Sequence, residues 1–224
     1  MKNKIDIVLK KTSKFFSRKG IYPFLKQEFS KIEPGANVFL VGAGGSINEL
    51  LDGYARKENF RVTSFDIDQT KSPDILGDLC THEFSRYNFF DYIVVSEVLE
   101  HIHSPHLAID QIYNLLKPNG KLIITVPFIF PIHERPIDYY RYTKYGLEFL
   151  LREFRNIKIE ERNSWAEAIN VLTVRLIMEK HLTARLAAPF FIGLAYLRMP
   201  FIILTSRVIS TDFMTTGYLV TAEK

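Results

Sequence analysis

The sequence predicts an α/β protein with a doubly wound, mostly parallel sheet that carries helices on both faces. Apolar, strand-like runs alternate along the chain with segments of helical periodicity, which is typical of such sheets. One stretch makes the prediction specific. The apolar run Val38–Val41 leads into three glycines within four residues and then into a helix. A strand, a glycine turn and a helix in this order open a nucleotide-binding α/β sheet.

The same periodicities divide the rest of the chain. The expected helices lie at 1–32 with breaks at Gly20 and Pro23, at about 46–56, from Pro105 to about 116, from Thr143 onwards, and across most of 164–210. The expected strands lie at 38–41, 61–66, 72–79, 90–96, 121–126, 157–159 and 216–222. Ser46 and Thr143 suit N-caps, and Pro105 suits a first helical position. Residues 117–120 and Pro127 mark the two ends of the fifth strand.

This pattern predicts one core with two decorations. We expect an N-terminal helical extension at 1–32, a core at 33–161 and 211–224, and an apolar helical insertion or cap at 162–210. A chain of 224 residues with 47% hydrophobic content can bury a core of this size. The N-terminus lacks a secretory signal pattern, so a cytoplasmic location is the expectation.

Cysteine and histidine usage bears on metals and disulfides. Cys80 is the single cysteine, which excludes a disulfide framework and a cysteine zinc site. His101, His103 and His106 fall in a loop and a helix start with no fixed common face, so we expect no metal.

The second strand ends at a carboxylate. Asp66 follows the glycine turn by roughly 20 residues, the spacing at which an acidic residue hydrogen-bonds ribose hydroxyls in dinucleotide-type folds.

At this point the residues resemble the class I S-adenosylmethionine-dependent methyltransferases, and within them the small-molecule branch called type 11. The similarity covers about residues 36–160 and the final strand. The stretches that carry it are Val38–Leu51, Asp66, Gly77-Asp78-Leu79, Phe90–Ile102, Leu116–Leu122, Pro127 and Asp138–Leu147. The resemblance implies a Rossmann-like sheet of seven strands, whose last strand is antiparallel and lies beside the fifth.

The resemblance also implies a cofactor and its site. S-adenosyl-L-methionine would be the methyl donor and S-adenosyl-L-homocysteine the product. The residues implied in cofactor binding are Gly42, Ala43, Gly44, Asp66, Ile67, Asp78, Leu79, Ser96, Glu97 and Val98. Two positions depart from the family pattern. Leu40 stands where an acidic residue is usual, and Ser46 replaces the usual third glycine.

Methyl transfer to oxygen or nitrogen calls for a base near the methyl group. His101, just past the fourth strand, is the first candidate, and His133 is the second. Each could instead be a structural histidine that orients a loop. Asp138, Tyr139, Tyr140 and Arg141 follow the fifth strand, so they are candidates for binding the acceptor. The alternative is a lid held by its own ion pair and tyrosine contacts.

Two segments suggest surface contacts. Residues 1–19 are basic and amphipathic, and residues 186–204 are apolar. The apolar segment could be a cap, a homodimer surface or, together with 1–19, a peripheral contact with the inner face of a membrane. A membrane crossing is disfavoured by Pro189, Gly193, Arg198 and Pro200, and by the final strand, which must return to the same sheet. No nucleic acid partner is expected, because the chain lacks an aromatic-basic module.

Three functions remain open from the sequence. The first is an enzyme that methylates a small molecule at oxygen, with a sugar or a lipid-linked metabolite as one acceptor class. The second is a catalytically inactive relative that binds the cofactor or a nucleotide, which Leu40 suggests. The third is an NAD-type oxidoreductase, which Ile47 disfavours because it occupies the position of the third dinucleotide-binding glycine.

Overall fold

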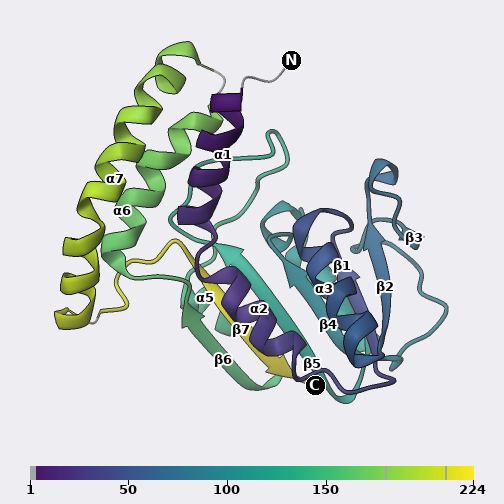
Figure 1. The fold of residues 1–224 in the computed structure, drawn as a ribbon. Helices are drawn as coiled ribbons and strands as arrows, with labels where there is room; N and C mark the ends of the chain where they lie inside the picture. Colours follow the sequence, from purple (N-terminus) through teal and green to yellow (C-terminus); the bar gives the residue numbers. More distant parts are fainter. Residues whose placement is uncertain (1–3, 180, 210) are drawn as a thin grey trace. The chain divides into compact units, whose positions relative to one another are not determined.

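The computed structural model describes residues 4–179, 181–209 and 211–224. The chain divides into two compact units. The sheet unit comprises residues 24–127, 134–160 and 219–224, and the helical unit comprises residues 1–23, 128–133 and 161–218. The elements are labelled in Figure 1.

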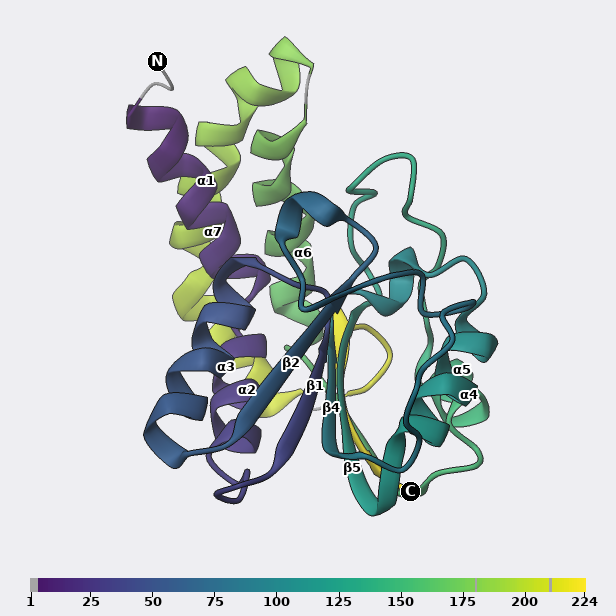
Figure 2. The same cartoon turned by 90° about the vertical axis from the view of Figure 1, so that its right-hand side faces the viewer.

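The sheet has seven strands in the order β3-β2-β1-β4-β5-β7-β6. They are β1 Asn37–Val41, β2 Arg61–Asp66, β3 Ile75–Leu76, β4 Phe90–Ser96, β5 Leu116–Pro127, β6 Arg155–Glu161 and β7 Gly217–Glu223. The first five strands pair in parallel; Val38, for example, lies opposite both Val62 and Tyr92. Figure 2 shows β2, β1, β4 and β5 side by side. Their carboxyl ends therefore meet at one edge, where ligands of such sheets bind.

Strand β7 runs against β5. The Lys224 N–H donates to the Gly120 carbonyl at 3.0 Å, while the Phe128 N–H donates to the Thr216 carbonyl at 2.8 Å. Residue numbers rise along one strand as they fall along the other, so the two strands are antiparallel. This confirms the antiparallel last strand beside the fifth, and with it the predicted fold class.

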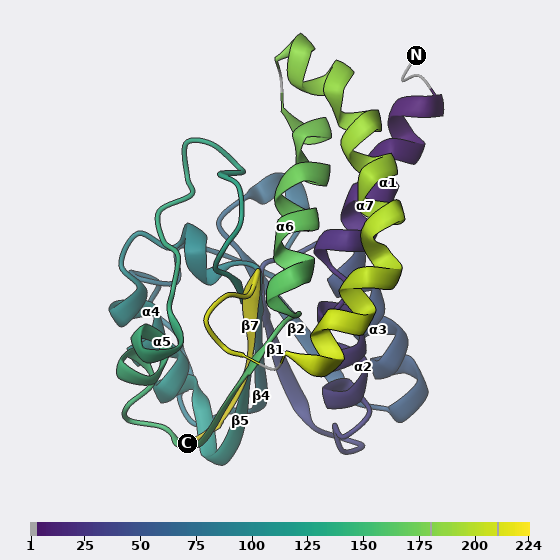
Figure 3. The same cartoon turned by 90° about the vertical axis from the view of Figure 1, so that its left-hand side faces the viewer.

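Helices cover both faces of the sheet unit. Figure 3 shows α4 (Pro105–Leu115) and α5 (Lys144–Leu150) on one side and α3 (Gly45–Glu58) on the other. Two 3-10 turns, at Gln69–Lys71 and Leu99–His101, follow β2 and β4. In the buried core of this unit, the ring of Phe39 contacts those of Phe65 and Phe90, at centroid distances of 5.6 and 4.7 Å.

Of the two helix breaks predicted near the N-terminus, one differs from the structure. Helix α1 spans Lys4–Ser17 and α2 spans Ile21–Phe29, so the break at Gly20 is confirmed and the break at Pro23 is wrong. Pro23 lies in the first turn of α2, where an N–H has no acceptor within the helix and a proline is tolerated. Gly20 is required because a Cβ there would lie 2.1 Å from the Arg162 carbonyl oxygen.

The start of α3 also differs. Gly44, rather than Ser46, is the N-cap, and its φ of 78° is a conformation that favours glycine. Strand β3 is shorter than predicted, and β5 is longer because Leu116 already pairs with Phe90 before an irregularity at 117–120. The residues that looked like a turn are therefore a bulge within the strand.

The helical unit contains α1, α6 (Trp165–Val174), a 3-10 turn at Arg175–Met178 and α7 (Leu182–Val208). Figure 1 shows α1, α6 and α7 side by side, and Phe16, Val174, Ile192 and Ala195 form their shared buried core.

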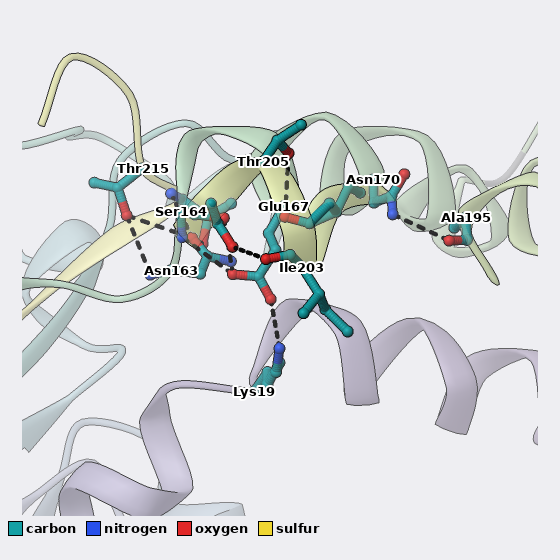
Figure 4. Close-up of polar contacts among 12 residues, drawn as sticks. Lys19, Asn163, Ser164, Glu167, Asn170, Ala195, Ile203, Thr205 and Thr215 are labelled. Atoms are coloured by element: carbon teal, nitrogen blue, oxygen red, sulfur yellow. Dashed lines mark hydrogen bonds and ion pairs between the residues drawn. The ribbon is translucent and has the colours of Figure 1, made fainter. Parts of the chain in front are cut away.

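Polar contacts inside this unit are drawn in Figure 4. Lys19 pairs with Glu167 at 2.6 Å, and Glu167 completes a capping box with Ser164 at the start of α6. Helix α7 is long and apolar enough to cross a membrane by length and composition, with a mean hydropathy of 1.7 and 22% of that window buried.

Candidate functional site

The turn after β1 is built from glycines in left-handed conformations. The φ angles of Gly42, Gly44 and Gly45 are 93°, 78° and 72°. Residues with a Cβ adopt such angles only with strain. Space is limiting as well, because a Cβ on Gly42 would lie 2.6 Å from Cγ2 of Val98. The turn after β1 is therefore packed against the residues that follow β4, as the carboxyl-edge prediction requires.

Asp66 connects the ends of β1 and β2. Its Oδ2 accepts the N–H of Ala43 at 2.8 Å, and its Oδ1 accepts the N–H of Asp68 at 2.8 Å. An ionised carboxylate has about four acceptor positions, so each oxygen of Asp66 keeps one for a ligand hydroxyl. Ile67, the next residue, is exposed and places an apolar surface beside this carboxylate.

Asn48 is a member of this turn that sequence reasoning missed. Its Oδ1 accepts the N–H of Gly44 at 2.9 Å, and its Nδ2 donates to Asp52. An amide side chain four residues after the N-cap glycine was the available signal. Because Ala43 and Gly44 both donate their N–H groups to side chains, the turn lacks two of the amides that a pyrophosphate group would use.

The residues after β4 form a second hydrogen-bonded group. Ser96 and Thr125 share a hydroxyl–hydroxyl bond of 2.8 Å, and the Thr125 hydroxyl lies 3.1 Å from Oε1 of Glu97. Glu97 has a φ of 55°, and its N–H donates to the Thr125 carbonyl at 2.8 Å. Thr125, on β5, thus fixes Ser96 and Glu97. The sequence predicted the segment Ser96–Val98 at the site, but it did not predict the part of Thr125.

Asp78 lies after β3 and contacts two groups. Its Oδ1 accepts the Cys80 N–H at 2.9 Å, and its Oδ2 lies 3.3 Å from Nε2 of His103. Burial raises the pKa of the Asp78 carboxyl, but these hydrogen bonds outweigh it and leave the pKa below its ordinary value. The side chain is therefore a charged acceptor at neutral pH. Leu79, beside it, is buried.

Asp78, Cys80 and His103 also bring three potential metal-ligand atoms within 4.8 Å of one another. Burial raises the pKa of the Cys80 thiol, which disfavours the thiolate that a metal would bind. The sequence-based expectation of a site without metal stays a prediction.

His101 is held by the loop after β5. Its Nδ1 lies 2.6 Å from the Ile137 carbonyl oxygen. A carbonyl can only accept, so Nδ1 carries a proton. The other ring nitrogen, Nε2, lies 3.7 Å from Oε1 of the buried Glu100. The same loop is fixed where Tyr139 and Tyr140 donate their N–H groups to the Glu100 carbonyl at 2.9 and 3.2 Å.

Asp138 and Arg141 bind each other. Two hydrogen bonds of 2.6 and 2.7 Å join the guanidinium to the carboxylate, and the Asp138 side chain is 2% exposed. The hydrogen bonds to Asp138 raise the pKa of Arg141 above its ordinary value. These contacts support the interpretation of a lid held by its own ion pair. Tyr139 and Tyr140 remain exposed on that loop.

The second candidate base, His133, is not part of the sheet unit. His133 belongs to the helical unit, where its ring contacts Phe130 edge-on at a centroid distance of 5.4 Å. Its part in the site stays a prediction.

Comparison with known families identifies the family of this chain. A family model described as a methyltransferase domain matches residues 18–169, about two thirds of the chain. The chain belongs to this methyltransferase family. The match confirms the predicted class of S-adenosylmethionine-dependent methyltransferases and its cofactor, and it removes the basis for the NAD-type alternative. The type 11 branch within the class stays a prediction.

Solved structures share the fold of this methyltransferase at low identity. Phosphoethanolamine N-methyltransferase 2 from Haemonchus contortus, in complex with S-adenosyl-L-methionine, is 17% identical with a TM-score of 0.59, over 89% of this chain and 51% of that one. A methyltransferase from Archaeoglobus fulgidus is 16% identical with a TM-score of 0.60, over 92% and 94%. The [4+2]-cyclase SpnF is 17% identical with a TM-score of 0.60, over 93% and 81%.

One curated protein matches a shorter stretch. Probable polyketide synthase 15 from Dictyostelium discoideum is 35% identical over 57 residues, which is 25% of this chain and 2% of the synthase. The methyltransferase thus spans about half the length of the Haemonchus enzyme and a small fraction of the synthase.

The residues present fit the methyltransferase cofactor. Asp66 keeps acceptor positions that ribose hydroxyls can use, and the glycine turn leaves its main chain open to close approach. Leu40, however, is 1% exposed within β1 and offers no polar atom at the position where the family usually has a carboxylate. The assignment of each residue to a part of the cofactor stays a prediction.

Proposed function

We propose that this protein transfers a methyl group from S-adenosylmethionine to the oxygen of a small-molecule acceptor. The observation that carries the proposal is the bond between the Ala43 N–H and the Asp66 carboxylate, which joins the glycine turn to the acidic residue after β2. Related folds support a small acceptor. One structure of the Haemonchus enzyme contains phosphomonomethylethanolamine and S-adenosylhomocysteine. That of a Burkholderia thailandensis methyltransferase contains 1,6-didemethyltoxoflavin.

The bound cofactor supplies an electrophilic methyl group on a sulfonium, and the protein supplies binding and position. Asp66 accepts ribose hydroxyls through the lone pairs that its backbone contacts leave. Asp78 is kept ionised by Cys80 and His103, and with Leu79 it would hold the adenine. Ser96, Glu97 and Val98 would line the floor of the cofactor pocket.

His101 is the proposed base. Its Nδ1–H is donated to the Ile137 carbonyl, and its Nε2 lies 3.7 Å from Oε1 of Glu100. Nε2 is therefore the ring atom proposed to exchange a proton with an acceptor hydroxyl, with the Glu100 carboxylate beside it. His133 is the second candidate. Among the acceptor-binding candidates, Tyr139 and Tyr140 have exposed side chains for contact with the acceptor, whereas Asp138 and Arg141 hold the loop. A sugar or a lipid-linked metabolite remains the acceptor class proposed from the sequence, and the cytoplasmic location stays a prediction.

A second candidate function is cofactor binding without transfer. Leu40 favours it, because a buried aliphatic side chain cannot help to organise the amino end of the cofactor. The two functions differ in turnover and share the cofactor site.

Calorimetry with S-adenosylhomocysteine tests the site. We expect binding to the wild type, and about tenfold or greater weakening in Asp66→Ala, because hydrogen bonds to a charged acceptor are lost. Glu49→Ala, which removes an exposed acidic residue of α3, is the matched control and should bind like the wild type. Thermal melts establish that both variants are folded. Equal affinity in the wild type and Asp66→Ala would refute the proposed site.

An acceptor screen separates the enzyme from the binder. The wild type is incubated with S-adenosylmethionine and pools of hydroxylated small molecules, and S-adenosylhomocysteine is measured. Release above the level without acceptor supports transfer. Binding with no release from any pool supports the second candidate.

A further inference from the structure

Helix α7 has two different faces. Its buried positions are Ala188, Ile192, Ala195 and Ile202. Its large apolar side chains on another face are exposed over 60–77% of their surface, and these are Leu186, Phe190, Leu197, Phe201, Leu204 and Val208. They recur at intervals of three, four or seven residues, so they form one stripe along the helix. We call these six residues the α7 stripe.

The contacts of α7 within the helical unit fix which face points outward. Asn170 of α6 donates its Nδ2–H to the Ala195 carbonyl at 3.2 Å (Figure 4), and Phe16 of α1 contacts Tyr196 at 5.1 Å between ring centroids. Turning the α7 stripe inward would break the buried hydrogen bond and empty the core around Ile192. The stripe is therefore a stable outer surface of this unit, and exposed patches of this length mark interaction sites.

Charge indicates the partner. The helical unit holds thirteen Lys and Arg residues against five Asp and Glu residues, whereas the remainder of the chain holds sixteen against twenty. The sequence 182–208 contains three arginines and no acidic residue. Lys11, Lys14 and Arg207 are exposed within this unit. The matching surface must accept apolar side chains and carry negative charge.

The basic helix α1 packs against α7 within this unit. The rings of Phe15 and Phe16 are 5.7 Å apart, and Phe16 contacts Tyr196, so the exposed Phe15 and Tyr196 border one junction. Apolar and cationic groups thus occur together, as they do in segments that lie in a lipid headgroup region.

We propose that the α7 stripe docks on an anionic phospholipid membrane, with α7 lying in the plane of the interface. A spanning orientation would surround α7 with lipid and would expose its contacts with Asn170 and Phe16. A pair of α7 helices from two copies fits less well. Residues 182–208 carry three arginines and no acidic residue, so pairing two copies of this helix would bring like charges together. The proposal does not depend on methyl transfer.

Flotation with lipid vesicles tests the docking. The purified full chain is mixed with vesicles of phosphatidylcholine alone or with added phosphatidylglycerol. We expect flotation with the anionic vesicles that high salt reduces, because screening weakens contacts of exposed charges. Phe201→Glu should lower the partition coefficient about tenfold or more. The matched control is Phe149→Glu on α5, whose ring is similarly exposed, and it should float like the wild type.

Further variants separate charge from apolar contact. The double variant Lys11→Gln, Lys14→Gln should lower partition about fivefold per residue on anionic vesicles only. Circular dichroism establishes that each variant is folded. Wild-type protein that stays in the pellet with anionic vesicles, or Phe201→Glu that floats as well as the wild type, overturns the proposal. Light scattering of the chain without lipid distinguishes self-association. A dimer that Leu197→Glu dissociates, together with no flotation, assigns the stripe to a second copy.

Discussion

Gly42 illustrates how a single residue positions the site. It has a left-handed φ of 93° and lies against Val98, so it brings the turn after β1 close to the residues that follow β4. Its N–H also donates to the Phe65 carbonyl at 2.8 Å. The geometry of three strand ends therefore depends on the absence of one Cβ.

Gly42→Ala should destabilise the protein by about 2 to 4 kcal/mol, because it adds a strained φ and a contact that the neighbour must relieve. The control is Gly53→Ala within α3, where a Cβ would meet nothing within 4 Å. That variant should stabilise the helix by up to about 1 kcal/mol. Denaturant unfolding measures both. A Gly42→Ala variant as stable as the wild type would contradict the packing described here.

The sequence identifies site residues well where a local pattern marks them. It misses residues whose role depends on a partner far away in the chain. Asp66 follows from its place after an apolar run, and its backbone contacts agree with that place. Thr125 and His103 could not be found in this way, because their partners Glu97 and Asp78 lie 28 and 25 residues away. The break predicted at Pro23 was wrong for a different reason. A proline breaks a helix in its interior but not in its first turn, and the sequence does not show where the helix starts.

At the scale of elements, α5 shows a start signal that the sequence identifies correctly. Thr143 is its N-cap, and its hydroxyl oxygen accepts the Gly146 N–H at 3.0 Å. This helix follows the loop that holds His101 and the exposed tyrosines. Its first turn therefore fixes where the candidate lid ends.

Thr143→Ala should cost about 0.5 to 2 kcal/mol, because one N–H of the first turn loses its acceptor. Thr143→Ser keeps the oxygen and should remain within about 0.5 kcal/mol of the wild type. Thermal unfolding of the three proteins under one condition gives the comparison. Equal losses in both variants would assign the effect to the methyl group rather than to the cap.

The presence of each strand was easier to predict than its first and last residues. β4 matches its predicted residues because an apolar, β-branched run has few other uses in a globular chain. The start of β5 was missed because Pro118, Asn119 and Gly120 are turn formers in any local analysis. Their place in the strand depends on pairing of Leu116 with Phe90, which the local sequence does not show.

At the scale of the whole molecule, one carboxylate ties three strands together at the amino edge of the sheet. Asp91 on β4 accepts the N–H of Asn37 on β1 at 2.8 Å and binds Nζ of Lys117 on β5 at 2.8 Å. Burial raises the pKa of Asp91, but these two hydrogen bonds outweigh it and leave the pKa below its ordinary value.

This direction sets a pH dependence. A carboxyl whose pKa is lower in the folded state stabilises the fold above its unfolded pKa, about 3.9, and loses that contribution as pH falls through the folded pKa. Asp91→Asn should therefore lower the free energy of unfolding by about 1 to 3 kcal/mol at neutral pH, and the difference should shrink below about pH 4. Asp110→Asn, on the exposed side of α4, is the control. A difference that is constant from pH 7 to pH 3 would contradict the assignment.

The division of the chain into two units reflects tertiary structure. The sequence separates a core from flanking helical segments, but α1 and α7 share a hydrophobic cluster although more than 160 residues lie between them. Periodicity shows that each helix has an apolar face, and it does not show which faces meet.

The place of β7 has a consequence for the order of synthesis. In the part of the sheet that the structure describes, β6 is attached through β7, yet β7 is translated after β6 and after all of α7. While the ribosome makes the 27 residues of α7, the nascent chain holds a finished β6 with no strand to receive it, and the outer edge of β5 has no partner. Unpaired edges of this kind invite pairing with other chains. Rapid translation through residues 182–216 would therefore favour correct assembly, and stalling there would favour aggregation.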